Sequence, residues 1–255
     1  MKNLFFPVLL SALFSLGLTK QPELIIKSQK SGPFLVNSYL VYDPVSREAA
    51  FIDAGNVIDS LLSIIDSEHL KLKYIFLTHA HQDHITGVNT VLRKYPKAKF
   101  CMAGEEYNDF MKYAGWRTLF DQNSVKAWEK DSLIVKLMDF GYKRSGKPDV
   151  FLNDNMRFNL GKIIITVIKT PGHSRGSVTF SAGKNIFTGD LLLYHSAGFL
   201  DYALCSKVEI VASIRKLYAF FPDETVIWSG HGKPSTIGYE KTGNINVTVN
   251  KVTWE

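Results

Sequence analysis

Histidine and aspartate are concentrated in one short stretch of this sequence, Thr78-His79-Ala80-His81-Gln82-Asp83-His84. The stretch follows the apolar run Tyr74-Ile75-Phe76-Leu77 and leads, through Ile85-Thr86-Gly87, into a segment with helical spacing. This pattern indicates a turn between a strand and a helix. Neutral imidazoles and carboxylates are the ligands of tetrahedral metal sites, at about 2.0–2.2 Å from the ion. We therefore interpret the stretch as a metal-binding turn rather than a histidine-rich surface loop.

The spacing within the stretch suggests two ions rather than one. Residues two apart in an extended segment point the same way, so His79 and His81 can bind one ion together. Asp83 and His84 lie beyond the turn and can serve a second ion. The sequence therefore predicts a site with more than one metal.

Three further ionisable residues also follow apolar runs, namely His173 after Thr170-Pro171-Gly172, Asp190 after Phe187-Thr188-Gly189, and His231 after Ser229-Gly230. Five of the seven histidines thus fall at expected strand ends or in the turn that follows. A Pro-Gly turn holds a stiff and exposed backbone, which suits a ligand such as His173. This regularity predicts that the side chains meet at one edge of the fold.

The elements that must position these residues can be read from apolar periodicity. We expect strands at 24–26, 37–42, 49–53, 72–77, 99–103, 156–158, 163–168, 178–180 and 185–187, and helices at 57–65 and 88–94. Asp53 ends one of these strands, where it either caps the following turn or supports the metal ligands by hydrogen bonding. For residues 105–148 we predict a helical insertion. It would either form one or two helices that cover the entrance of the site, or pack against the fold away from the site.

Composition is that of an ordinary globular protein, with 255 residues, 45% of them hydrophobic and 21% charged, enough for one large or two small domains. The net charge of +6 is spread without a long basic run. We read it as favouring solubility, and we predict a small-molecule substrate rather than nucleic acid. Cys101 and Cys205 could pair or stay free, and Cys101 fits a buried apolar position better than a reactive thiol.

The N-terminal segment predicts a targeting signal. Residues 1–21 begin with Met1-Lys2-Asn3, continue with an apolar run over 4–18 and end in polar residues, which is typical of a secretory signal peptide. A stable membrane span needs about 20 apolar residues, so we do not expect one. We predict a secreted or periplasmic protein whose catalytic domain spans 22–255. If the segment is not a signal, the protein would be cytoplasmic.

The ordered motifs resemble those of the metallo-β-lactamase fold superfamily. Three of the motifs are most similar to those of the hydroxyacylglutathione hydrolase (glyoxalase II) branch, in its short single-domain form. They are Thr170-Pro171-Gly172-His173, Phe187-Thr188-Gly189-Asp190 and Gly230-His231-Gly232. The resemblance covers residues 38–239. It implies an α/β fold, a four-layer αββα sandwich with the metals at one edge.

The resemblance also implies a ligand set for two divalent metal ions, most often zinc, with iron or manganese as alternatives. One ion would be held by His79, His81 and His173, the other by Asp83, His84 and His231, with Asp190 bridging them. Two such ions about 3.5–4 Å apart lower the pKa of a shared water from 15.7 toward about 7. Asp83 is the candidate catalytic residue, because a carboxylate within hydrogen-bond reach can steer the proton of the nucleophile.

The substrate region departs from the glyoxalase II pattern. Phe199 stands where the family has a basic residue, and only 24 residues follow His231, too few for the helical region that helps bind glutathione. Tyr194 and His195 lie close in sequence to Asp190 and are candidates for substrate contact, although such a pair is more often ordinary surface.

We predict a metal-dependent hydrolase that cleaves a thioester, a lactone or a related acyl bond. The first alternative is a single-iron enzyme like the persulfide dioxygenases, which would use His79, His173 and Asp190. The others are a β-lactamase or a non-catalytic metal-binding protein of the same fold.

Overall fold

A computed structural model describes residues 23–56, 58–112, 122–132, 135, 146–200 and 204–253. The expected signal peptide at 1–21 lies outside these residues, and so does much of the expected insertion at 105–148. Within the described ranges, none of the helices has the length and apolar character needed to cross a membrane.

Two six-stranded sheets form the body of the fold. The first has the order β1-β2-β3-β4-β5-β6, and its strands are Ile25–Ser31, Val36–Tyr42, Glu48–Ile52, Lys71–Phe76, Lys99–Ala103 and Val150–Leu152. The second has the order β14-β13-β10-β9-β8-β7, with strands Ser235–Thr236, Val226–Ser229, Asn185–Gly189, Val178–Ala182, Ile163–Lys169 and Arg157–Leu160. A small ribbon pairs β11 (Leu192–Leu193) with β12 (Ser196–Ala197).

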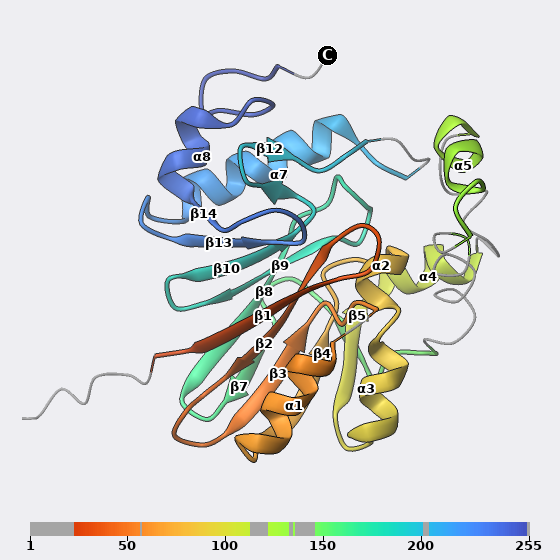
Figure 1. The fold of residues 1–255 in the computed structure, drawn as a ribbon. Coiled ribbons are helices and arrows are strands. Elements are labelled where there is room, and N and C mark those ends of the chain that lie inside the picture. The colour runs from red at the N-terminus through yellow and green to blue at the C-terminus, as the bar shows by residue number, and fades with distance from the viewer. Residues whose placement is uncertain are drawn as a thin grey trace, which may run out of the picture.

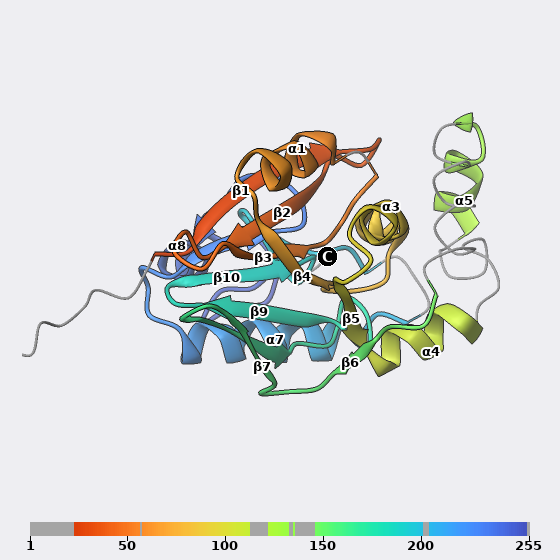
Figure 2. The same ribbon diagram turned by 90° about the horizontal axis from the view of Figure 1, so that it is seen from below.

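Helices cover the outer faces of both sheets (Figure 1). The helices are α1 Asp59–Ser67, α2 Gln82–Ile85, α3 Val88–Lys94, α4 Gly104–Lys112, α5 Gln122–Trp128, α7 Lys207–Phe220 and α8 Ile237–Gly243. Figure 2 shows the layers edge-on, with α1 and α3 over the first sheet and α7 over the second. This arrangement confirms the αββα sandwich that the sequence predicts.

Alternating side chains in the strands explain the four layers. On β3, Ala49 and Phe51 pack toward α1 and α3, whereas Ala50 and Ile52 pack between the two sheets. Successive side chains of a strand point to opposite faces, so a strand that is apolar at every position is buried on both. A third apolar cluster, which includes Ile214 of α7, joins the second sheet to its helices.

Parallel pairing brings the chemistry-bearing strand ends to one edge. In the first sheet Ile52 pairs with Phe76 and Phe76 with Cys101, so the residues after β3, β4 and β5 leave the sheet together. In the second sheet β10 and β13 are also parallel. The hairpin turn that contains Gly183 lies at the other end of β10. Asp53, the histidine stretch, Asp190 and His231 therefore share one edge.

Hydrogen bonds join the two sheets at this edge. The backbone N–H of Val178 donates to the carbonyl of Thr78 at 2.9 Å, and the Tyr39 hydroxyl donates to the Ser229 carbonyl at 2.6 Å. The backbone N–H of Asn37 donates to the carbonyl of Gly230 at 2.6 Å. Because buried polar groups are costly unless paired, these bonds fix how the two sheets meet.

The expected strands are present, with ends that shift by a few residues, and α1 begins at Asp59 instead of 57. Helix α7 and strand β6 were not expected. Cys101 is a free cysteine, so the structure has no disulfide between Cys101 and Cys205. Cys101 is buried, and burial raises the pKa of its thiol to about 12, as expected for an apolar filler.

The ring of Phe76 tests the packing between the sheets. It is fully buried, with centroids 4.9 Å from both Phe158 and Phe180. Replacing Phe76 with Ala should lower the free energy of unfolding by about 3–5 kcal/mol, measured by denaturant unfolding, because the cavity lies between two rigid sheets. The control Val208→Ala, at a position 80% exposed on α7, should change it by less than about 0.5 kcal/mol. Equal effects of the two substitutions would contradict this packing.

Candidate metal centre

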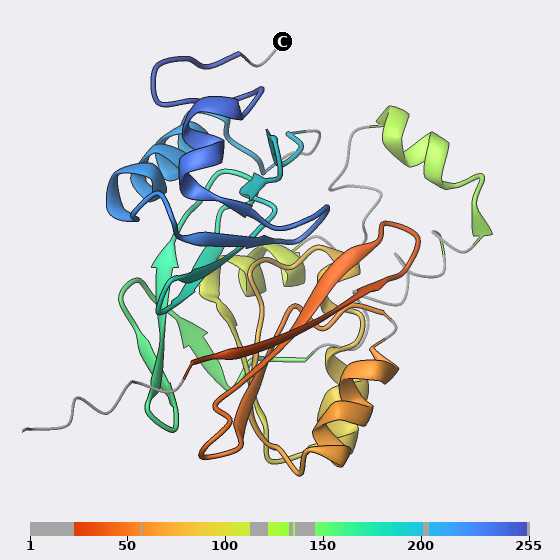
Figure 3. The same cartoon turned by 60° about the vertical axis from the view of Figure 1, so that its left-hand side comes forward.

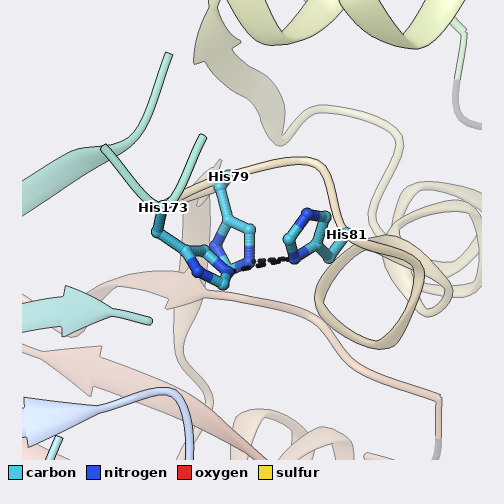
Figure 4. Close-up of side chains that lie close together, drawn as sticks. All are labelled: His79, His81 and His173. Carbon is cyan, nitrogen blue, oxygen red and sulfur yellow. Dashed lines mark hydrogen bonds between the residues drawn. The ribbon is translucent and has the colours of Figure 1, made fainter. Parts of the chain in front are cut away.

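Three imidazoles from two different loops converge in the structure, and we call His79, His81 and His173 the first triad (Figure 4). His81 Nδ1 lies 3.0 Å from His79 Nε2 and 3.1 Å from His173 Nε2. Tetrahedral ligands about 2.05 Å from an ion are about 3.3 Å apart, so the spacing is close to that of a coordination site. The first triad can therefore hold one metal ion.

A second group, Asp83, His84 and His231, forms what we call the second triad. Asp83 Oδ2 lies 3.2 Å from His231 Nε2 and 3.8 Å from His84 Nε2. In each triad the candidate ligand atoms lie within 4.8 Å of one another. The second triad can hold another ion.

Asp190 lies between the two triads. Its Oδ2 is 3.7 Å from His173 Nε2 and 3.3 Å from His231 Nε2, and its Oδ1 is 3.5 Å from His84 Nε2. One carboxylate thus faces imidazoles of both groups, which is the position that a bridging ligand needs. The structure brings together all seven side chains that the sequence singled out as candidate ligands.

The ring nitrogens that face away from the cluster are held by hydrogen bonds. His173 Nδ1 bonds to the Phe199 carbonyl at 3.0 Å, and His231 Nδ1 bonds to the Phe34 carbonyl at 2.9 Å. A carbonyl can only accept, so both Nδ1 atoms carry a proton in these bonds. In neutral rings, Nε2 then carries the lone pair, which points into the cluster.

Asp53 holds His84 directly and His79 through Thr78. Its Oδ2 accepts from His84 Nδ1 at 2.9 Å and from the Thr78 hydroxyl at 2.7 Å. The same hydroxyl lies 3.0 Å from His79 Nδ1, and Asp53 Oδ1 accepts from the Thr78 backbone N–H at 2.8 Å. Of the two roles that the sequence left open, the structure thus favours support of the histidines, with a simultaneous contact to the turn.

Burial and charge favour opposite protonation in the two triads. Burial lowers the pKa of all three imidazoles of the first triad, so they are neutral, as ligands must be. Burial also opposes charge on His231, but the carboxylates of Asp190 and Asp83 raise its pKa to about 10. Positive charge is therefore favoured beside these two carboxylates.

Two buried atoms of the cluster support a cation. His84 Nε2 and Asp190 Oδ1 have no hydrogen-bond partner among the described residues. A buried carboxylate oxygen without a partner is costly, and a metal ion is the usual group that satisfies it. Gly230 permits this close approach, since a Cβ there would lie 2.1 Å from Asp190 Oδ1. The residues present thus fit a metal centre.

Glu106 is a buried residue of this region that the sequence reading missed. It lies in the first turn of α4 and is 5% exposed. Its Oε2 accepts from the backbone N–H of Ala80 at 2.7 Å, and its Oε1 accepts from that of Gly176 at 2.8 Å. One carboxylate therefore joins the loop that carries His79 and His81 to the loop that carries His173.

The two candidate substrate residues lie outside the cluster. Tyr194 stacks on Tyr239 with centroids 5.5 Å apart, and His195 Nδ1 lies 3.2 Å from the Tyr239 hydroxyl. Gly232, next to His231, has an idealised Cβ 4.0 Å from the Tyr194 Cβ. Their contact with substrate stays a prediction.

Part of the expected insertion approaches the site from the other side. Helix α5 stands beside the sandwich, toward the turn between β1 and β2 (Figure 3). At its end, the Trp128 ring makes an edge contact with Phe34 at 5.8 Å between centroids. Since the Phe34 carbonyl bonds to His231, α5 is two contacts away from the cluster. Its role as a cover of the entrance stays a prediction.

Comparison with known families agrees with the fold and the cluster. The sequence profile of the Metallo-beta-lactamase superfamily matches residues 31–231. The chain belongs to this superfamily. The match begins at the end of β1 and ends at His231, so this superfamily member carries every candidate ligand within the family region.

Several proteins are similar to this member of the superfamily. Hydroxyacylglutathione hydrolase GloC of Haemophilus influenzae is 27% identical over 224 residues, which cover 83% of this chain and 92% of the relative. The crystal structure of the B3 metallo-beta-lactamase BLEG-1 aligns with a TM-score of 0.70 at 28% identity, over 86% of this chain and 98% of that one. TTHA1623 in a di-iron-bound form aligns at 0.67 and 26%, with the same coverage.

The carboxylate of Glu106 provides a test of how the loops are held. Glu106→Gln keeps the shape but removes one acceptor oxygen, and Glu106→Ala removes both. We expect metal affinity, measured by competition with a chelator, to fall by about tenfold or more in both variants while the circular dichroism of the folded chain is kept. The control Glu105→Gln changes a neighbouring carboxylate that pairs with Lys169, and it should leave the affinity unchanged. Unchanged affinity in Glu106→Ala would contradict this role.

Proposed function

We propose that this protein is a hydrolase with two bound metal ions, zinc by preference, that cleaves a thioester, lactone or related acyl bond. The observation that carries the proposal is the position of Asp190 between two complete triads. The similarity to GloC supports an acyl substrate of the thioester class. Iron is an alternative metal that the di-iron-bound form of TTHA1623 supports, and manganese is a further alternative.

The first and second triads would each hold one ion, with Asp190 shared. When bound, such ions polarise the carbonyl under attack and lower the pKa of a water to about 7. The chain's own residues supply orientation. Hydrogen bonds to Phe199, Phe34 and Asp53 fix the rings of His173, His231 and His84, so these ligand nitrogens need not reorganise during the reaction.

Asp83 is the residue that we propose for proton handling. It is half-buried beside His231, whose Nε2 is 3.2 Å from its Oδ2. Burial would raise the pKa of Asp83, but His84 and His231 lower it, so the group is an anion that can accept a proton. A water attacking an acyl carbon at this edge would lose its proton to such a carboxylate.

A panel of thioesters and lactones, with metal content measured on the same sample, tests the proposal against its rival. About two metal ions per chain together with ester or thioester hydrolysis would support it. One iron per chain with persulfide-dependent oxygen uptake would support the dioxygenase alternative instead. The second triad favours the hydrolase, because a single-iron site does not need Asp83, His84 and His231.

Asp190 gives the sharpest prediction. Asp190→Ala removes the carboxylate that both triads share, so hydrolysis should fall by more than about a hundredfold, beyond the range for groups that only support a ligand. Initial rates and metal content should be measured together, since the variant should also bind less metal. Asp154→Ala, at an exposed position after β6, serves as the control and should keep full activity. Full activity in Asp190→Ala would refute the two-metal site.

A further inference from the structure

A lysine lies directly beyond the last candidate ligand. Lys233 follows His231 by two residues, in the turn between β13 and β14, so the two Cα atoms are no more than about 7 Å apart. Lys233 is exposed, and its turn continues into Pro234, which restricts the backbone. The lysine is thus at the edge where the metal cluster is assembled.

Aromatic rings hold the lysine in place. Its Nζ lies 4.0 Å from the centroid of the Tyr194 ring, within the range of a cation–π contact. Tyr194 in turn stacks on Tyr239 of α8, with 9° between the ring planes, and the two hydroxyls are 3.3 Å apart. The ammonium therefore rests on a rigid support, which reduces the entropy that an exposed lysine would lose on binding a ligand.

Among the residues that the structure describes, the positive charge of Lys233 has no acidic partner. No carboxylate among the described residues forms an ion pair with it. Glu240 is near in sequence but fully buried, and its oxygens accept from the His195 N–H, the Ser235 hydroxyl and the Asn244 amide. The nearest acidic side chain of α8 is thus already occupied.

A second observation concerns residue 199. Phe199 is an apolar side chain that is 75% exposed, and its backbone carbonyl bonds to His173 of the cluster. Position 199 therefore offers no charge to a substrate. Lys233, in the loop after β13, supplies a positive charge beside this cluster.

We propose that Lys233, supported by Tyr194 and Tyr239, binds an anionic group of the substrate, so that the preferred substrates are acyl compounds with a carboxylate or phosphate. This inference rests on the proposed function and narrows it. The stacked tyrosines add an apolar face beside the charge, which suits a substrate whose anionic end is attached to an organic chain. It also gives Tyr194 a role as a support for the binding residue.

Four butyryl or glutaryl thioesters test which anionic group Lys233 binds, and on which side of the thioester bond. Butyryl-N-acetylcysteamine is neutral, glutaryl-N-acetylcysteamine and butyryl-N-acetylcysteine carry a carboxylate on the acyl or the thiol side, and butyryl-phosphopantetheine carries a phosphate. We expect Lys233→Ala in the full metal-loaded chain to raise KM for at least one anionic thioester by about fivefold, the upper range for an exposed ion pair. KM for the neutral thioester and kcat for all should change by less than about twofold.

A control variant and a binding measurement distinguish failure of the proposed hydrolase function from failure of the proposed role of Lys233. Lys184→Ala removes the same charge at the opposite end of β10 and should change no KM. Thioether analogues of the same four compounds, which cannot be hydrolysed, should show the same preference by calorimetry. If no thioester is cleaved, the proposed function fails, and the analogues alone decide the inference. Equal affinity of wild type and Lys233→Ala for every anionic compound would overturn it.

Discussion

The hydrogen bonds that join the two sheets at one edge are the constraint on which the rest of this structure depends. The first sheet supplies the histidine stretch after β4, and the second supplies His173, Asp190 and His231. Neither sheet holds a complete set of candidate ligands. The bond from Val178 to Thr78 and the bond from Tyr39 to Ser229 set the distance between the two groups. Small shifts of one sheet against the other would separate the triads.

The buried charge at this edge has an energetic consequence. Asp53, Asp83 and Asp190 are all buried or nearly so, in a region with five imidazoles. Removing so many ionisable groups from water is costly unless each is paired. A bound cation would satisfy the atoms that lack partners, so metal binding and folding stability are expected to be coupled in this protein. The bound ion would therefore supply part of the folding free energy of this protein, as it does in many metalloproteins.

Local patterns were sufficient to predict most of the fold and the cluster. The histidine stretch has a spacing that few other structures explain, and the strands before each candidate ligand are apolar at nearly every position. The parallel pairing that brings strand ends together then follows from general rules for such sheets. Helix α7 was missed although Ser206 caps it by accepting from Glu209, a Ser-x-x-Glu signal that the sequence displays.

Residues whose role depends on distant partners could not be predicted. Glu106 appears in the sequence as an acidic residue at the start of a helix, where such residues are common. Its two acceptor bonds go to Ala80 and Gly176, which are 26 and 70 residues away. Lys233 is equally ordinary in the sequence, because its support by Tyr194 comes from a loop about forty residues earlier. Spacing reveals ligands on one loop but not contacts between loops.

The hairpin turn between β9 and β10 has a practical use that follows from its place. Gly183 has φ +59°, and a side chain there would meet nothing within 4 Å. Asp190 lies beyond the far end of the five-residue strand β10, which spans about 17 Å. A short peptide tag or fluorophore inserted at this turn would point into solvent, remote from the metal centre. The strand that delivers Asp190 thus also provides a site for labelling this protein.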